Sequence, residues 1–275
     1  MAIFLKYISV FAVQPGMMNI RGRRQQNHFM NEAGMEKIFF ISDVHLGMET
    51  DAENEKESAL LEFLDAIAKP GNRLFILGDL FEFWFEYNFV IPRRHFHILA
   101  KLDEIARRGV RIDYIIGNHD FWIDHFFEET LNITVHQHPL QTDIDGKRFF
   151  IAHGDGMAKS DRGYRLLKRI LRNRFNIFLY RMIHPDLGFR LALFFSRLSR
   201  GQNNDNRFAE EYVSAAREQF QKGFDFVIFG HTHHPYQLRE DHRLYINTGD
   251  WITHFSYAVF ENGELNLMYW KEMSE

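Results

Sequence analysis

The feature that most constrains the fold is a series of five short apolar runs, each followed at once by a polar loop. The runs span residues 37–43, 73–79, 111–118, 147–155 and 224–231. Near-continuous apolar sequence of this length predicts strands that are buried on both faces. Helical periodicity over 56–69 and 92–108 separates the first three runs. This order predicts an α/β fold with a parallel-rich sheet and helices on both of its faces.

The boundaries of these elements carry further signals. Pro92 lies in the first turn of the second predicted helix and Gly109 follows its end, the positions that these residues favour. Residues 243–251, 256–262 and 264–270 predict three more strands. The Asn262-Gly263 pair between the last two predicts a tight hairpin turn.

The first part of the chain lacks such a pattern. Residues 19–34 are polar and show no periodicity, and Met35 then opens the first strong strand. We therefore expect residues 1–34 to be a disordered N-terminal extension, and residues 35–275 to form one domain. No apolar run reaches the 18 residues or so that a spanning helix needs.

Hard metal ligands follow all five apolar runs. Taken singly, these Gly-Asp and Asp-x-His motifs are weak signals, because glycine and aspartate suit ordinary turns. Turn geometry alone does not readily explain why such motifs follow every one of the five runs. In addition, parallel strands bring their carboxyl ends together at one edge of a sheet. We therefore expect one site at the same edge of one sheet, built from seven side chains: Asp43, His45, Asp79, Asn118, His153, His231 and His233.

The chemistry of these ligands favours a pair of divalent cations. The chain has no cysteine, so any metal must bind nitrogen and oxygen, which favours Mn, Mg, Fe or Zn. Two cations about 3.5–4 Å apart can hold both the attacking and the leaving oxygen of a displacement at phosphorus. The sequence thus indicates a dinuclear phosphoesterase.

These motifs, in this order, resemble the signature of the calcineurin-like metallophosphoesterases. The resemblance covers residues 37–255 and implies a four-layer α/β/β/α sandwich. It implies that Asp79 bridges two metals, with Asp43, His45 and His233 completing one site and Asn118, His153 and His231 the other. It also implies that His119 is the general acid or stabilises the leaving group, with Asp120 as its orienting partner.

Residues 157–208 interrupt the strand–helix order. The part from 157 to 200 is helical in period and holds eleven basic residues against two acidic ones, although the whole chain has a net charge of −4. Arginine alternates here with Leu, Ile and Phe, as in interfacial helices. We interpret 157–208 as an inserted helical lid that contacts a ligand or surface with both anionic and apolar groups. The alternative is an ordinary helix face that is exposed to solvent.

Several stretches further resemble the UDP-2,3-diacylglucosamine hydrolases of lipid A synthesis: 78–84, 117–122, 153–164 and 230–235. The resemblance implies cleavage of the pyrophosphate of a UDP-linked diacyl sugar, typically with Mn(II), to UMP and a lipid monophosphate (lipid X). It also implies substrate contacts from Asn118, Asp161, Tyr164 and Arg200. Two positions depart from the family pattern: many members have Arg at the position of His119, and the run 157–160 differs.

The expected partners follow from this resemblance. We expect a cytoplasmic protein, peripheral on the cytoplasmic face of the inner membrane. We expect no nucleic-acid partner, because the basic residues alternate with apolar ones. The nearest alternative is a metallophosphoesterase for another nucleotide, sugar-nucleotide or lipid phosphate. A non-catalytic scaffold is a third alternative, against which the full ligand set argues.

Overall fold

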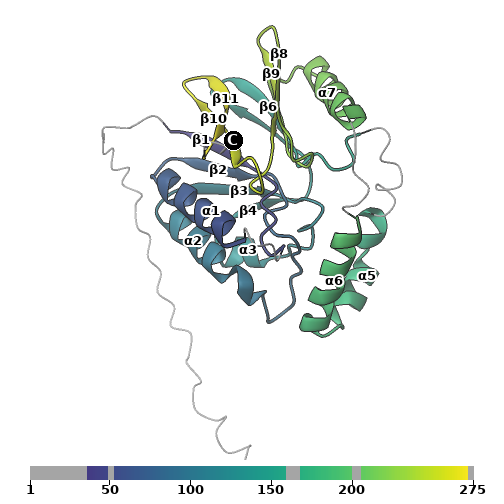
Figure 1. Ribbon diagram of the computed structural model, residues 1–275. Coiled ribbons are helices and arrows are strands. Elements are labelled where there is room, and N and C mark those ends of the chain that lie inside the picture. Colours follow the sequence, from purple (N-terminus) through teal and green to yellow (C-terminus); the bar gives the residue numbers. More distant parts are fainter. Residues whose placement is uncertain (1–35, 49–52, 159–167, 200–205, 272–275) are drawn as a thin grey trace, which may run out of the picture. The chain divides into compact units, whose positions relative to one another are not determined.

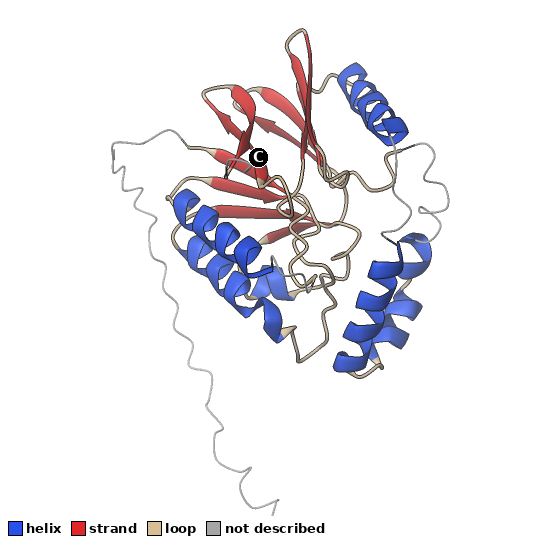
Figure 2. Cartoon of the chain, in the orientation of Figure 1, coloured by secondary structure: helices blue, strands red, loops and turns tan. Residues whose placement is uncertain are grey.

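The structure is a computed structural model of the 275-residue chain, and it describes residues 36–48, 53–158, 168–199 and 206–271 (Figures 1 and 2). The predicted extension 1–34 lies outside these residues, as do Asp161, Tyr164 and Arg200. None of the helices in the described part of the chain is long and apolar enough to cross a membrane.

The first sheet has six strands in the order β11-β10-β1-β2-β3-β4. Strands β1 to β4 are parallel neighbours, and β10 and β11 extend the sheet as an antiparallel hairpin. The strands are β1 Ile38–Ile41, β2 Arg73–Ile76, β3 Arg111–Ile115, β4 Thr134–His136, β10 Ser256–Glu261 and β11 Glu264–Tyr269.

The second sheet has five strands in the order β5-β6-β7-β9-β8. Its central strands β6, β7 and β9 are parallel, and the two edge strands are antiparallel to their neighbours. The strands are β5 Leu140–Ile144, β6 Lys147–Ile151, β7 Phe226–Phe229, β8 Pro235–Glu240 and β9 Arg243–Thr248.

The helices lie between and after these strands. Both predicted helices are present, the second with a short 3₁₀ turn η1 at its start. Residues 174–199 of the predicted lid form two helices, and a third runs past the predicted end of the lid. The bounds are α1 Glu53–Ile67, η1 Arg93–His95, α2 Phe96–Arg107, α3 Phe126–Glu129, α5 Arg174–Arg181, α6 Pro185–Ser199 and α7 Asn206–Gln221.

Three apolar clusters separate four layers. One lies between helices α1 and α2 and the outer face of the first sheet, a second joins the two sheets, and a third packs α7 on the second sheet. The period-two alternation of the strands produces this arrangement: Phe39 and Ile41 face the helices, whereas Ile38 and Phe40 face the other sheet. Figure 2 shows the two sheets with helices on their outer faces. The expected α/β/β/α sandwich is confirmed.

One detail of the predicted architecture is corrected. We expected all ligands at the edge of one sheet, but the five apolar runs divide between two. The first three become β1, β2 and β3, and the last two become β6 and β7. The carboxyl ends of these five strands still face the same region, because the residues after β1 and β2 contact those after β6 and β7. The site therefore lies between two sheet edges, and each sheet contributes side chains to it.

Candidate metal centre

All seven predicted ligands lie on loops directly after parallel strands. Asp43 and His45 follow β1, Asp79 follows β2, and Asn118 follows β3. His153 comes after β6 in the second sheet. The loop after β7 then supplies the last two ligands, His231 and His233.

Glycine allows these loops to approach one another. A Cβ atom at Gly117 would collide with the Asp79 carboxylate, and one at Gly230 would lie 2.6 Å from Asp43 Oδ2. Both distances are below any normal van der Waals contact. The glycine before Asn118 and the one before His231 are therefore required by the closeness of the ligands, and not only by turn geometry.

The backbone of the site is strained. Five of the seven predicted ligands have a positive φ, between 50° and 70°. Asn, Asp and His tolerate this left-handed region better than other residues, but it still costs each of them free energy. Strain of this kind persists where the surrounding structure enforces it, which is typical of functional sites. The five residues are Asp43, His45, Asp79, His231 and His233.

The first ligand group contains Asp43, His45 and His233, whose candidate ligand atoms lie within 4.8 Å of one another. His45 Nε2 is 3.8 Å from Asp43 Oδ1 and 3.7 Å from Asp79 Oδ2. His233 Nε2 is 3.6 Å from Asp43 Oδ1. These separations suit atoms that share one cation about 2.0–2.2 Å from each of them.

The second group contains Asp79, His153 and His231, again within 4.8 Å of one another. His153 Nε2 lies 3.4 Å from Asp79 Oδ2, 3.2 Å from His231 Nδ1 and 2.9 Å from Asn118 Oδ1. Asp79 thus contacts ligands of both groups, through the same oxygen Oδ2. Its other oxygen, Oδ1, accepts the His119 backbone N–H at 2.9 Å.

Two deeply buried atoms test whether metals fit this site. Asp43 Oδ1 and His45 Nε2 have no hydrogen-bond partner in the described part of the chain, although both residues are almost fully buried. A buried polar atom without a partner costs roughly 1–3 kcal/mol. Both atoms point toward the first ligand group, so a cation there would satisfy them. The donor set therefore fits a divalent metal ion.

Charge in the site shifts several pKa values. Burial opposes the charged form of His45, but contacts with Asp43 and Glu82 raise its pKa to about 9. Burial opposes the charged form of His153 too, yet Asp79 raises its pKa to about 10. Burial and the nearby His153 lower the pKa of His231 to about 4. In the protein without metal, protons on two histidines thus balance the excess negative charge.

This balance predicts that metal binding releases protons. A cation must displace the protons of His45 and His153, whereas His231 is already neutral. The affinity for Mn(II) should therefore rise as the pH increases toward about 9. Calorimetric titrations near pH 7, in buffers with different ionisation enthalpies, should count about two protons released. A pH-independent affinity without proton release would contradict this account.

His119 lies beside the first ligand group. Its ring meets the His45 ring edge-on, with centroids 4.7 Å apart. His119 Nδ1 lies 2.9 Å from the carbonyl oxygen of Glu82, so that Nδ1–H donates there and Nε2 remains for a substrate. Burial lowers the pKa of the ring, whereas the Asp79 carboxylate raises it.

The predicted role of Asp120 is corrected. We expected its carboxylate to orient the His119 ring, but the Glu82 carbonyl makes that contact. Asp120 instead accepts the N–H groups of Gly117 and Leu80, both at 2.9 Å, and the Tyr114 hydroxyl. It therefore ties the loop after β2 to the loop after β3. Burial and the nearby Asp79 raise its pKa to about 6.

Sequence reasoning missed two carboxylates behind the metal ligands. Glu82 Oε2 lies 3.1 Å from His45 Nδ1, and Asp250 Oδ2 lies 3.6 Å from His233 Nδ1. Both carboxylates are buried. The signal was present, because a metal-binding histidine needs an acceptor for its second nitrogen. However, the sequence offered many acidic residues and no means to pair them with histidines.

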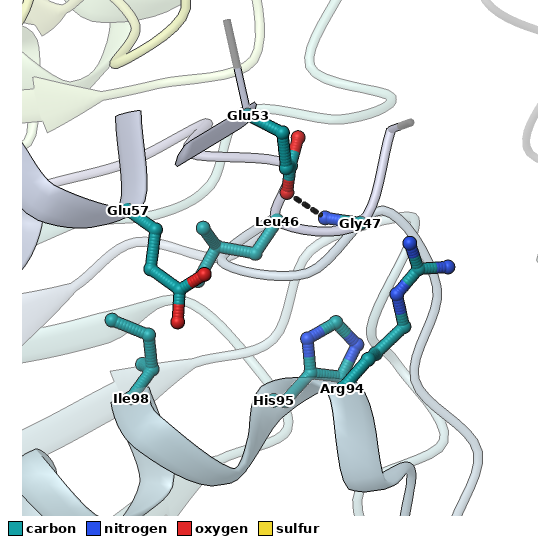
Figure 3. Close-up of a pocket in the computed structure, with 7 residues that line it drawn as sticks. All are labelled: Leu46, Gly47, Glu53, Glu57, Arg94, His95 and Ile98. Atoms are coloured by element: carbon teal, nitrogen blue, oxygen red, sulfur yellow. Dashed lines mark hydrogen bonds between the residues drawn. The ribbon is translucent and has the colours of Figure 1, made fainter. Parts of the chain in front are cut away.

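Helix α1 holds the loop that carries His45. Buried Lys56 donates to the His45 carbonyl oxygen at 2.7 Å. Gly47, Arg94 and His95 line a cavity of about 120 Å³ together with residues of α1, and Figure 3 shows these lining residues. A Cβ atom at Gly47 would lie 3.2 Å from the side chains of both Arg94 and His95. The loop is thus confined on two sides, which limits how far His45 can move.

The aromatic residues near the site have two roles. Phe81, Trp84 and Phe85 are buried in the core. Others form the surface on which helices α5 and α6 pack. Tyr180 of α5 lies 4.9 Å from Trp122, measured between ring centroids, and the indole N–H of Trp122 donates to the Leu171 carbonyl at 3.1 Å.

Basic residues of the predicted lid reach the metal side of the molecule. Arg172 lies over the Phe121 ring and donates to the Gly117 carbonyl oxygen at 3.4 Å. Lys168 pairs with Asp155. Both line a cavity of about 270 Å³ that also includes His153, and its other lining residues are mainly apolar. A mainly apolar cavity lined by two basic side chains and by Asp155 therefore adjoins the second ligand group.

Most of the remaining histidines lie away from the seven ligands, but the ring of His254 contacts the site, with its Nδ1 3.1 Å from Asp250 Oδ1. His95 is buried against Phe81, and His97 and His242 are exposed. His136 lies in strand β4 and pairs with Asp113 at 2.8 Å.

Known proteins resemble this chain over most of its length. The sequence model of the calcineurin-like phosphoesterase family matches residues 36–235. A protein from Porphyromonas gingivalis called UDP-2,3-diacylglucosamine hydrolase is 34% identical over 259 residues, which cover 86% of this chain and 98% of that protein. A protein of the same name from Azotobacter vinelandii is 32% identical, with coverage of 77% and 89%. A solved phosphoesterase from E. coli aligns with a TM-score of 0.45 at 17% identity, covering 86% of this chain and 95% of that one.

Proposed function

The chain belongs to the calcineurin-like phosphoesterase family, and from that premise we propose that it hydrolyses the pyrophosphate bond of UDP-2,3-diacylglucosamine. The products would be UMP and the lipid monophosphate lipid X, as a step of lipid A biosynthesis, with two Mn(II) ions as cofactors. The observation that carries the hydrolytic chemistry is the position of Asp79 between two groups of metal ligands. The names of the relatives support the choice of substrate.

The seven ligands would hold the two cations in the groups described above. When bound, such a pair supplies Lewis-acid activation of water and offsets negative charge at phosphorus. The chain itself fixes the ligands, because the loops that bear them are tied together by Asp120 and confined by glycine contacts. Asn118, which faces His153, would also contact the substrate.

His119 would act on the leaving phosphate. Its Nδ1–H is held by the Glu82 carbonyl, which orients Nε2 for proton transfer. Burial lowers the pKa of the ring. A bound pyrophosphate adds negative charge, which favours the protonated ring. Nε2–H can then donate to the departing oxygen.

The predicted lid supports a substrate with an anionic head and apolar tails. Arg172 and Lys168 bring positive charge to the cavity beside His153, and α5 and α6 present apolar side chains. Anionic groups would meet the cationic side chains, and acyl chains would meet the apolar ones. The contacts expected from Asp161, Tyr164 and Arg200 stay predictions.

Substrate selectivity tests this proposal. With Mn(II), the purified protein should hydrolyse UDP-2,3-diacylglucosamine with a kcat/KM at least about a hundredfold above that for UDP-glucose. The reason is that each buried CH₂ group contributes about 0.8 kcal/mol, so even a few buried methylenes reach this ratio. Release of UMP measures both reactions. Equal turnover of the two would indicate a phosphoesterase for another nucleotide or lipid phosphate.

The same helices are proposed to rest on the inner membrane, at its cytoplasmic face. On α5 and α6, and at Met182 directly after α5, several large apolar side chains are between 40% and 72% exposed: Phe175, Phe178, Leu179, Met182, Leu187, Leu191 and Phe194. Large apolar side chains exposed in this number on two neighbouring helices suit a membrane or partner surface. Arginines on the same helices suit anionic lipid headgroups.

Vesicle binding tests the membrane contact. Replacing Phe175 and Phe178 together by glutamate should weaken sedimentation with anionic phospholipid vesicles by about tenfold or more, since burying one Phe contributes about 1.5–3 kcal/mol. Met268 and Tyr269 on β11, which are 43% and 49% exposed, offer a matched control pair outside the lid. If their replacement by glutamate weakens binding equally, the lid is not the membrane-binding surface.

A further inference from the structure

The two ligand groups differ in what lies behind their histidines. In the first group, His45 Nδ1 faces the Glu82 carboxylate at 3.1 Å, and His233 Nδ1 faces the Asp250 carboxylate at 3.6 Å. In the second group, His153 Nδ1 lies 2.7 Å from a neutral acceptor, the Leu77 carbonyl oxygen. The fourth histidine, His231, turns its Nδ1 toward the ligand group itself.

A carboxylate behind a histidine does more than a carbonyl does. Both acceptors fix the ring, but the carboxylate also makes the metal-binding nitrogen more basic and adds negative charge near the cation. In the first group, each of the two histidines therefore has a carboxylate behind it. In the second group, His153 has a carbonyl oxygen in that position. Loss of one such partner typically weakens metal affinity about 10- to 100-fold.

Both carboxylates are themselves held in place. Glu82 is buried, and its N–H donates to the Leu46 carbonyl oxygen at 2.9 Å, next to the bridge that joins the loops after β1 and β2. Asp250 is buried too, and its Oδ1 accepts the N–H groups of Thr253 and His254, both at 2.9 Å. A partner with a fixed rotamer holds its histidine more firmly than a mobile one.

We propose that Glu82 and Asp250 are positioning residues that make the site of Asp43, His45 and His233 the tighter of the two, so that it fills first. The second site then takes up its ion at a higher metal concentration, and it sets the concentration at which the centre becomes complete. This inference rests on the two-metal centre of the proposed function, but not on the identity of the substrate.

Metal titration of the full chain without substrate tests the proposal. Calorimetry with Mn(II), supported by the EPR signal of free Mn(II), should resolve two ions of unequal affinity in the wild-type protein. In Glu82→Gln and in Asp250→Asn, the tighter ion should bind about 10- to 100-fold more weakly, and the weaker ion should change less. In Glu82→Gln the amide oxygen can still accept the His45 Nδ1–H, so the loss reports the charge. In Asp250→Asn, the residue 3.6 Å from His233 Nδ1 keeps its shape and loses its charge.

Two further variants assign the effect. Asn118→Ala weakens the second site, so the ion that still binds reports the first site alone. In the double variant Asn118→Ala/Glu82→Gln, the affinity for that ion should fall by the same factor as in Glu82→Gln. Asp113→Asn is the matched control, because Asp113 is a buried carboxylate paired with a histidine, His136, outside the centre. It should leave both affinities unchanged.

Other outcomes would overturn the proposal. These are two ions of equal affinity in the wild type, equal weakening of both ions by Glu82→Gln, or the same weakening in Asp113→Asn. The candidate ligand atoms of His45, Glu82 and His119 also lie within 4.8 Å of one another. A third ion that disappears in Glu82→Gln would make Glu82 a ligand instead. Since no substrate is used, any of these results leaves the proposed hydrolysis untouched.

Discussion

Replacing Asp79 by alanine is expected to abolish hydrolysis and to remove both metal ions together. Asp79 Oδ2 lies 3.7 Å from His45 Nε2 and 3.4 Å from His153 Nε2, so it is the carboxylate that both ligand groups share. Its loss leaves each group with less negative charge and one ligand fewer. Metal-ion catalysis contributes several kcal/mol, so kcat should fall by more than about 10³-fold.

The measurement combines turnover with metal content. Asp79→Ala should keep its far-ultraviolet circular dichroism but bind no Mn(II) at concentrations that saturate the wild type. Asp113→Ala is a fitting control, because it also removes a buried aspartate of the same sheet, here in the middle of β3. That variant should retain both ions and its turnover per folded molecule. Hydrolysis that persists in Asp79→Ala would refute the two-metal mechanism.

Replacing His119 by alanine should have the second-largest effect, and a different signature. We expect kcat to fall by about 10²- to 10⁴-fold, the usual contribution of a proton-transferring side chain. KM and both metal affinities should stay close to those of the wild type, because His119 is not among the seven ligands. The backbone N–H of residue 119, which Asp79 Oδ1 accepts, remains in the variant.

Added imidazole distinguishes proton transfer from a structural effect. If His119 moves a proton, free imidazole should restore part of the activity of His119→Ala. His136→Ala removes a partly buried histidine outside the site and should need no rescue. Loss of one metal ion from His119→Ala would show that the ring supports metal binding and would argue against the proposed role.

The central strands could be predicted because they are buried on both faces. Strands β1, β2, β3, β6 and β7 appear as apolar runs, and the last hairpin carries Asn262-Gly263. The strands β4, β5 and β8 could not be predicted in this way. They lie at sheet edges, where one side of the strand has no neighbour and polar residues are tolerated. Strand β8 even begins with Pro235, which only an edge strand or a strand's first residue accommodates.

The division into two sheets was also hidden. The sequence order shows which runs are strands but not which strands pair, since pairing depends on contacts between distant residues. The family resemblance implied two sheets, whereas the pattern of apolar runs alone suggested one. The ligand loops could still be predicted, because every parallel strand has its carboxyl end at the ligand side, whichever sheet it joins.

Within the site, direct neighbours in sequence were misleading. Asp120 follows His119 in sequence, yet its carboxylate turns back to the Gly117 N–H and across to the Leu80 N–H. The contact that orients His119 comes from Glu82, 37 positions away. Contacts of this kind depend on how two loops cross, which no local pattern encodes.

The centre draws its ligands from both sheets, and this gives the metals a mechanical consequence. Asp43 and His231 stand 188 positions apart in a chain without cysteine, yet the carboxylate of one accepts the backbone N–H of the other at 2.8 Å. Cations bound between such residues would act as a reversible cross-link between the two sheets of the sandwich. Ligands that bind only the folded chain stabilise it by RT ln(1 + [L]/Kd). The free metal concentration would therefore set how stable the folded chain is, as well as how fast it works.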